Sequence, residues 1–293
     1  MSALGAAFCF GLASTMYTLA GRRIGASVSM ALSLAVSLVF LLPIHYLARG
    51  EFFPLGATLE RWLILGSSSV AGFVVSALLL LRSFQFIGPR LTMLIGSTSP
   101  VFAAVLSWFL LGQALPAYVA AGIILVLAGV IWVVSENAGE SLKDENADYR
   151  KGLLTAVAAA ATQGASFTLM SAGVADGYHA ISASLIRTVA GVAVLALFIC
   201  LRGSWSNRLK PMVAEPRAMI FLIFASLAGP VMGTTLVLLS LQFTSVGVSS
   251  TLNATTPIVL IPIGYLVFGE KITYRAVIGT CVAIAGVAVL FAG

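Results

Sequence analysis

Hydrophobic residues in this chain form long, nearly uninterrupted runs, without the regular admixture of polar residues that marks a soluble domain. Ten runs have roughly the 20 residues that an α-helix needs to cross a bilayer. They lie near residues 2–21, 28–48, 62–84, 89–111, 117–135, 152–173, 179–201, 218–241, 246–268 and 275–292. Inside a bilayer every backbone polar group needs a partner within its own segment, so the runs predict helices. The pattern therefore predicts an all-α integral membrane protein with ten transmembrane helices.

The second half of the chain repeats the first, and the match falls on residues that interrupt helices. Residues 83–130, shifted forward by 157 positions, align with residues 240–287 without a gap. The register pairs Ser83 with Ser240, Gln85 with Gln242, Phe86 with Phe243, Pro100 with Pro257, Gly122 with Gly279 and Gly129 with Gly286. A chance match of apolar residues would not also bring prolines and glycines into register.

Each copy holds an odd number of predicted spans, so the second copy should have the opposite orientation in the membrane. The sequence thus predicts two inverted five-helix repeats, at residues 1–135 and 152–293, joined by a polar loop at residues 136–151. Inverted repeats are typical of secondary transporters, whose substrate site lies near the midplane where the repeats meet.

The amino-acid composition narrows the class of protein further. Hydrophobic residues make up 60% of the chain and charged residues 9%, against about 25% charged in an ordinary soluble domain. The net charge of +6 is spread over short loops and forms no stripe, so we expect no nucleic-acid partner. The three cysteines lie inside apolar runs and predict neither a disulfide nor a metal site. We expect no cofactor.

Lysine and arginine are distributed unequally between the two sides of the predicted membrane. Arg49 and Arg61 lie on the side that holds both termini, whereas thirteen of the 16 basic residues lie on the side of the 136–151 loop. The positive-inside rule then places that loop in the cytoplasm and both termini outside.

Arg187 lies inside a predicted span, about eight residues or roughly 12 Å from its end. A cation at that depth costs roughly 2.5–3.5 kcal/mol on insertion scales, so it must face the protein or a wet cavity. One interpretation is an anchor for a substrate carboxylate, phosphate or sulfonate, which arginine contacts with two nitrogens. The other is structural, with the side chain bonded to carbonyls of a neighbouring helix.

Pro100 and Pro257 fall at the centres of the fourth and ninth predicted helices, where each removes a backbone hydrogen bond. We interpret them as kinks that act as hinges and help to line a polar cavity. The polar residues beside them that we select as candidate substrate contacts are Ser97, Asn253 and Thr256. The alternative is that the neighbouring hydroxyls only satisfy the freed backbone groups.

The first and sixth predicted helices carry further polar residues at mid-depth. The candidate substrate contacts among them are Ser14, Tyr17, Gln163 and Ser166. No Asp or Glu lies within a predicted span, which favours facilitated diffusion or exchange over proton antiport. The two histidines, His45 and His179, are expected to be interfacial residues near helix ends on the outer side.

Several local patterns resemble a known family. Ser-Phe-Gln-Phe-Ile-Gly at 83–88 matches Ser-Leu-Gln-Phe-Thr-Ser at 240–245, and Leu-Ala-Gly-Val at 127–130 matches Ile-Ala-Gly-Val at 284–287. With the paired prolines, the chain resembles the EamA-like bacterial branch of the drug/metabolite transporter superfamily over nearly its whole length. The family often has Trp-Gly in the first helix of each repeat, where this chain has Phe10-Gly11 and Gln163-Gly164.

The resemblance implies ten helices, alternating access, a central cavity and a place in the bacterial inner membrane. The family often has cytoplasmic termini, whereas the charge count favours termini outside. Glycines at 122, 129, 279 and 286 suit close helix packing, within the fold or at a homodimer contact.

These observations predict a carrier of a small polar organic metabolite, amino-acid-like and zwitterionic or anionic, with export inferred from the family's tendency. Membrane lipid is the other expected partner. Export of amines or cationic drugs, and translocation of a phospholipid or polyprenyl-phosphate headgroup, stay open as alternatives. An intramembrane enzyme is not expected, since the spans hold no acid pair, no G-x-S-x-G motif and no mid-membrane histidine.

Overall fold

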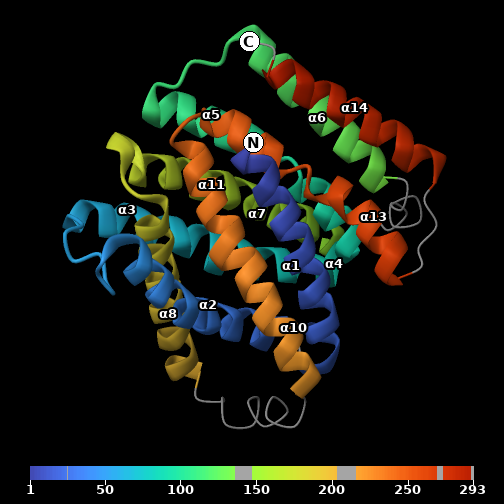
Figure 1. Cartoon of the computed structure of the whole chain (residues 1–293). Coiled ribbons are helices and arrows are strands. Elements are labelled where there is room, and N and C mark those ends of the chain that lie inside the picture. The colour runs from blue at the N-terminus through green and yellow to red at the C-terminus, as the bar shows by residue number, and fades with distance from the viewer. Residues whose placement is uncertain (25, 136–146, 203–215, 269–272, 292–293) are drawn as a thin grey trace.

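The computed structural model describes residues 1–24, 26–135, 147–202, 216–268 and 273–291. Over these residues the chain is helical and contains no strand (Figure 1). The first half contains α1 (Ser2–Ile24), α2 (Ala26–Arg49), α3 (Leu59–Ser69), η1 (Val70–Ser76), α4 (Ala77–Gly96), α5 (Ser99–Leu111) and α6 (Ala117–Ser135). The second contains α7 (Ala147–Gly173), η3 (Ala175–Gly177), α8 (Ala180–Arg202), α10 (Pro216–Ser226), η4 (Leu227–Gly233), α11 (Thr234–Leu241), α12 (Val246–Asn253), α13 (Thr256–Phe268) and α14 (Tyr274–Phe291).

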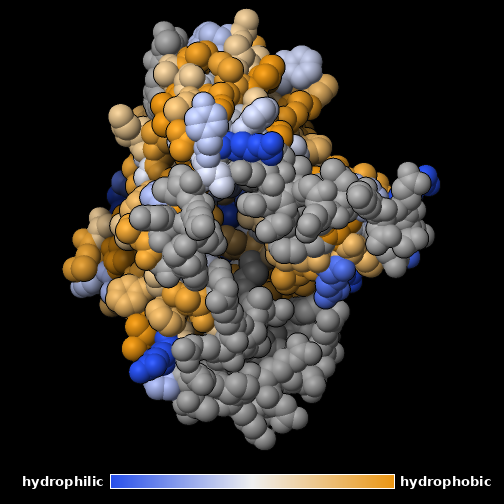
Figure 2. All heavy atoms as spheres, turned by 90° about the vertical axis from the view of Figure 1, so that its right-hand side faces the viewer, coloured by the Kyte–Doolittle hydropathy of each residue, from blue (hydrophilic) through white to orange (hydrophobic). Residues whose placement is uncertain are grey.

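The helices have the length and apolar character of membrane spans. Within the described residues, six stretches are long and apolar enough to cross a bilayer: Leu32–Arg49, Leu59–Ile87, Tyr149–Gly173, Ala180–Leu197, Pro216–Leu241 and Val246–Ile263. Large hydrophobic side chains are exposed on the surface of the molecule, and Figure 2 shows hydrophobic residues in orange on the side that carries α6 and α14. The prediction of an all-α, multi-pass integral membrane protein is confirmed.

Helix bounds recur at a fixed interval between the two halves. The segments α3, η1 and α5 begin and end 157 positions before α10, η4 and α13. Both η1 and η4 are π-helical turns, and each continues an α-helix on either side. The spacing of 157 positions therefore begins at residue 59, upstream of residues 83–130, which align in the sequence itself.

The two repeated prolines begin helices, whereas the sequence pattern placed them at helix centres. Helix α4 ends at Gly96 and α5 starts at Ser99, with Pro100 in the first turn of α5. Pro257 has the same place in α13, which starts at Thr256. The first turn suits proline because its backbone nitrogen needs no partner there and its fixed φ is already helical. Each proline thus marks a break between two helices.

The helix that begins each half packs mainly against helices of the other half. Helix α1 contacts α10, η4, α11, α12 and α13, while α7 contacts α3, η1, α4 and α5. The two halves are therefore interleaved.

Helices α6 and α14 lie side by side at the edge of the molecule (Figure 1). A Cβ atom on Gly129 would be 2.5 Å from the carbonyl oxygen of Gly279, and one on Gly286 would be 2.6 Å from the backbone nitrogen of Val126. The glycines of these helices thus serve a close contact within the chain.

Candidate functional site

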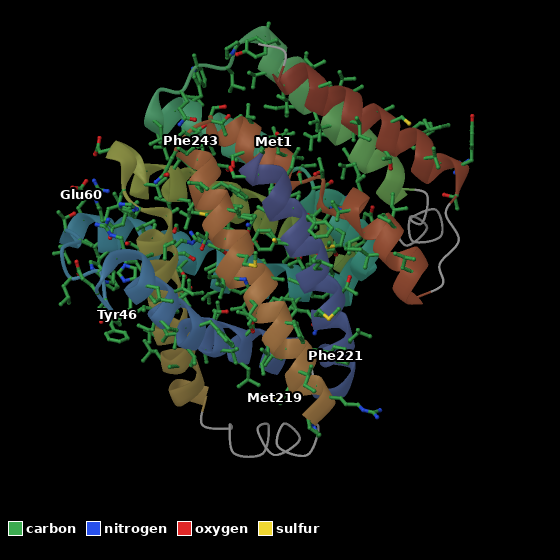
Figure 3. The ribbon with its side chains drawn as sticks, in the orientation of Figure 1. Met1, Tyr46, Glu60, Met219, Phe221 and Phe243 are labelled. Carbon is green, nitrogen blue, oxygen red and sulfur yellow. The ribbon has the colours of Figure 1, made fainter. Side chains whose placement is uncertain are left out.

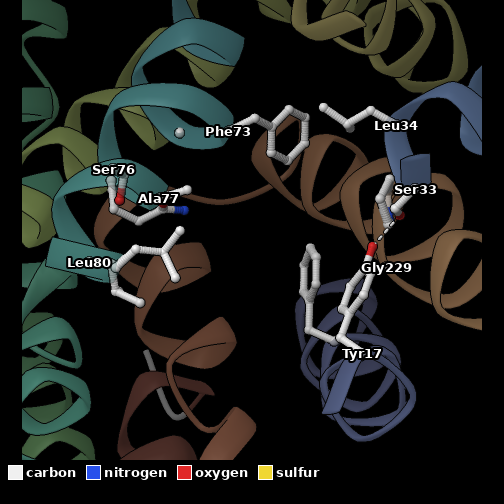
Figure 4. A pocket seen from close by; sticks show the side chains of 13 residues that line it. Tyr17, Ser33, Leu34, Phe73, Ser76, Ala77, Leu80 and Gly229 are labelled. Atoms are coloured by element: carbon white, nitrogen blue, oxygen red, sulfur yellow. Dashed lines mark hydrogen bonds between the residues drawn. The ribbon is translucent and has the colours of Figure 1, made fainter. Parts of the chain in front are cut away.

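A cavity of about 390 Å³ lies where α1, α2, η1, α4, α7 and η4 meet (Figure 4). Four of those segments belong to the first half and two to the second. Its lining residues are Phe10, Tyr17, Ser33, Leu34, Gly72, Phe73, Ser76, Ala77, Leu80, Leu81, Gln163, Gly229 and Pro230. A cavity of this size suits a small organic molecule.

The lining is mostly aromatic and aliphatic and includes no charged side chain. The Tyr17 hydroxyl is hydrogen-bonded to Ser33 Oγ, as the dashed line in Figure 4 shows. Ser33 Oγ in turn accepts a hydrogen bond of 3.0 Å from Ser226 Oγ. Since these residues come from α1, α2 and α10, the tyrosine is held in a polar network that joins both halves.

Two other polar side chains face the cavity from the opposite wall. Ser76 Oγ donates to the carbonyl oxygen of Ala159 at 3.0 Å and thereby ties the end of η1 to α7. Gln163 lies on α7, and its Oε1 is 3.7 Å from the position of a Cβ on Gly72. Tyr17 and Gln163 are the candidate residues from the sequence that the structure brings together in this lining.

The two π-helical turns both contribute to the cavity wall. Gly72 in η1 and Gly229 in η4 are 157 positions apart, and the next residues, Phe73 and Pro230, line the cavity as well. π-helical turns inside α-helices often occur at functional sites. The absence of a side chain at Gly72 lets Ser166 come close, because a Cβ there would be 2.6 Å from Ser166 Oγ.

We expect Gly72→Ala to destabilise the protein by about 1 kcal/mol. The new methyl would displace the Ser166 hydroxyl, which donates to the carbonyl oxygen of Ser68 at 2.7 Å, and one such hydrogen bond is worth about 0.5–1.5 kcal/mol. Thermal unfolding of the double variant Gly72→Ala/Ser166→Ala provides the control. If the double variant is no more stable than Gly72→Ala, the clash is not the cause.

Arg187 lies directly behind the cavity wall and is 2% exposed. Its guanidinium carbon is 5.0 Å from the centre of the Phe73 ring, which itself lines the cavity. One terminal nitrogen donates to Ser68 Oγ. Among the described residues its Nε has no hydrogen-bond partner, and neither has the nearby Ser184 Oγ. No described carboxylate forms an ion pair with Arg187. The cation is therefore only partly satisfied.

The remaining candidate residues lie outside the lining of this cavity. Ser14 Oγ donates to the carbonyl oxygen of Gly11 within α1, and Ser97 is the residue that directly follows the end of α4. Asn253 ends α12, and its Oδ1 is buried without a partner among the described residues. Thr256 Oγ1 donates to the backbone carbonyl of Asn253 at 2.7 Å, across the break between α12 and α13. At the break between α12 and α13 a hydroxyl group therefore donates to a backbone carbonyl, and the Asn253 Oδ1 is buried without a partner among the described residues.

The sequence interpretation did not select Ser33, Ser76, Phe73 or the two π-helical turns. Extending the 157-residue register upstream pairs Gly72 with Gly229 and would have drawn attention to both. No comparable signal in the sequence marks Phe73 or Ser33, since phenylalanine and serine are common in membrane helices.

A second, more polar pocket of about 300 Å³ lies at the end of the molecule formed by the end of α2 and the start of α3 and α8. Figure 3 shows Tyr46 and Glu60 at this end. The lining of this second pocket includes His45, Arg49, Glu51, Arg61, Asp176, Tyr178, His179 and Ser182. The burial of the Tyr178 ring raises the pKa of its hydroxyl, and the nearby charge of Arg61 opposes that shift.

His45, near the end of α2, is buried in the wall of this polar pocket. Its Nδ1 is 2.7 Å from the carbonyl oxygen of Glu51, and its Nε2 is 2.9 Å from Ser182 Oγ. A carbonyl oxygen only accepts, so Nδ1 carries a proton. Because two hydrogen bonds satisfy the ring, it can be buried.

Comparisons with known proteins agree with this fold. No curated protein matches the chain in sequence. One crystal structure has the same fold, with a TM-score of 0.75 at 19% identity, covering 98% of this chain and 94% of the other. The model of the EamA-like transporter family matches residues 1–135 and again residues 150–292. With nearly the whole chain matched, this protein belongs to the EamA-like transporter family, within the drug/metabolite transporter superfamily.

Proposed function

We propose that this chain is a secondary transporter that exports a small polar organic metabolite, amino-acid-like and zwitterionic or anionic, by alternating access. The observation that carries the proposal is the cavity whose walls come from both halves. The buried Arg187 cation lies behind the Phe73 side chain, which lines this cavity. Membership of a transporter family favours transport over catalysis.

The proposal includes ten helices arranged as two inverted five-helix repeats. Besides the six long stretches, four shorter apolar helices lie at Ser2–Tyr17, Ser99–Leu111, Ala117–Trp132 and Val277–Leu290. Together they would supply ten spans, and the recurrence of helix bounds at 157 positions supports a repeat. We place the protein in the bacterial inner membrane with both termini outside, and labelling of engineered terminal cysteines from the outside would test that orientation.

The chemistry of the lining supports an anionic or zwitterionic substrate with an apolar body. Phe10, Phe73 and the leucines of α4 would contact the body, and Tyr17 and Gln163 would bind its polar groups. When the Phe73 ring turns aside, a carboxylate could reach the Arg187 guanidinium, which forms strong charge-assisted hydrogen bonds. None of the lining residues is acidic, so an amine or cationic drug would find no counter-charge there.

A ligand panel on the purified protein in detergent tests the substrate class. We expect thermal stabilisation by one class among amino acids and organic acids, since a bound ligand stabilises the folded state by mass action. Stabilisation by amines alone would favour the cation exporter. Stabilisation only by lipids or polyprenyl phosphate would favour the headgroup translocator.

We expect Pro100→Ala and Pro257→Ala to slow turnover several-fold while ligand affinity changes little. The substitution restores a backbone N–H at a break between two helices, so the chain can continue the helix and lose its hinge. Initial rates in proteoliposomes, set against ligand-induced thermal shifts of the same variants, separate the two effects. Unchanged turnover in both variants would remove the hinge role.

A further inference from the structure

Polar contacts in the second pocket join residues 45–61 of the first half to residues 175–182 of the second. Arg49 Nη1 is 2.8 Å from His179 Nε2, and His45 Nε2 is 2.9 Å from Ser182 Oγ. Arg61 donates to the carbonyl oxygen of Ala175 at 3.3 Å and lies 3.5 Å from the Asp176 carboxylate. These contacts hold the two halves together at this end, and we call them the outer seal.

The Arg49–His179 contact fixes the protonation state of the histidine. A guanidinium nitrogen can only donate a hydrogen bond, so His179 Nε2 must accept with its lone pair. His179 is therefore neutral in this arrangement, with its proton on Nδ1. Protonation of Nε2 would set two donors and two positive charges against each other at 2.8 Å, and the contact would break.

The groups around His179 favour a charge-dependent rearrangement. Arg49 and His45 come from α2, Glu51 from the loop that follows, Arg61 from α3, and Asp176 and Tyr178 from the segment before α8. Arg61 already lies over the Tyr178 ring at 4.5 Å and forms an ion pair with Asp176. A protonated His179 would be repelled by Arg49 and attracted to the Glu51 and Asp176 carboxylates, and the seal would lose its contact to the end of α2.

Helix α8 links the outer seal to residues that lie behind the central cavity. Ser182 lines the polar pocket, and Arg187 lies five residues further along α8, roughly 7.5 Å along the helix axis, against the Phe73 ring of the cavity wall. A shift of the start of α8 would therefore move the residues behind the cavity.

We propose that the Arg49–His179 contact is a proton-sensitive latch, closed when His179 is neutral and released when it is protonated. The latch rests on the proposed carrier function, for which it supplies regulation by the pH of the outer side. Histidine is suited to this role because its charge ordinarily changes between about pH 5 and 8.

The test measures the opening of the seal directly and needs no substrate. Spin labels are attached to cysteines at Leu55 and Ala175, on the two sides of the pocket, after Cys9, Cys200 and Cys281 have been replaced by alanine. Pulsed electron paramagnetic resonance then gives the distance between the labels at about pH 7.5 and about pH 5.5, a range that spans histidine titration. We expect the ratio of long to short distances to rise roughly three- to tenfold at the lower pH, the effect of losing about one hydrogen bond.

Two variants assign that response to its residue. In His179→Gln the glutamine oxygen can accept from Arg49 without titrating, so the distances should no longer depend on pH. In His45→Gln the dependence should persist. The latch is overturned if the distance between the labels in the wild-type protein does not change with pH, or if the His179→Gln variant keeps the full change of this distance with pH. Because no ligand is present, such a failure is distinct from a failure of transport.

Discussion

Arg187→Leu is expected to abolish ligand-induced stabilisation while the ligand-free protein folds normally. The substitution removes the guanidinium that would hold the anionic group of the substrate, and hydrogen bonds to a charged group are worth about 1.5–3 kcal/mol. Affinity should therefore fall roughly 10- to 150-fold. Thermal unfolding with and without the ligand class identified for the wild type measures both effects.

The stability of the ligand-free variant separates a binding role from a structural one. Arg187 is buried, has no ion-pair partner among the described residues, and leaves its Nε without a hydrogen bond. Replacing such a cation with an apolar side chain of smaller desolvation cost should leave stability unchanged or increase it. A large loss of stability, with ligand binding retained at the wild-type level, would make Arg187 a structural residue.

Arg187→Lys is the matched control for charge. Lysine keeps one positive charge but cannot form the two-pronged contact with a carboxylate. We expect it to restore part of the ligand-induced shift. If Arg187→Lys and Arg187→Leu lose the ligand-induced shift equally, the two-pronged geometry of the arginine contact contributes more than its charge.

Gly129→Ala is expected to destabilise the fold more than Gly72→Ala does. The added Cβ would lie 2.5 Å from the backbone nitrogen of Ala283 and 2.5 Å from the carbonyl oxygen of Gly279. Backbone atoms cannot move aside as a side-chain end can, so α6 and α14 would have to separate. Such overpacking costs typically about 1–3 kcal/mol, and the apparent Tm in detergent should fall accordingly.

Gly96→Ala is the control for this prediction. Gly96 is also helical, but a Cβ there meets nothing within 4 Å. Because Gly96 is the last residue of α4 and the added Cβ meets no other atom, this variant should be close to neutral in stability. If Gly129→Ala and Gly96→Ala unfold at the same temperature, the close contact between α6 and α14 is not needed for stability.

The apolar runs were sufficient to predict helices and a membrane location, because burial in lipid requires both at once. They could not predict the π-helical turns of η1 and η4, whose residues are as apolar as their neighbours. Nor could they show that Pro100 and Pro257 begin helices, since a proline in an apolar run is compatible with either a kink or a break. The family was evident from motifs such as Ser-Phe-Gln-Phe and the paired prolines.

The surroundings of the candidate site depend on contacts that are distant in sequence. Arg187 was conspicuous as a charge in a predicted span, but its partner Ser68 is 119 residues away. His45 gave no sign of being buried, because its partner Ser182 is 137 residues away. Tyr17 and Gln163 were selected for polarity at mid-depth, and they lie in one cavity because α1 and α7 interleave with the opposite halves.

The most direct test of a carrier that alternates between two faces is counterflow in proteoliposomes, with the ligand that stabilises the wild-type protein. Vesicles loaded with unlabelled ligand should take up external labelled ligand faster than empty vesicles, and transiently above its equilibrium level, because each returning carrier brings one molecule inward. Uptake that is unaffected by internal ligand and rises in proportion to concentration without saturation would indicate a channel and contradict the account.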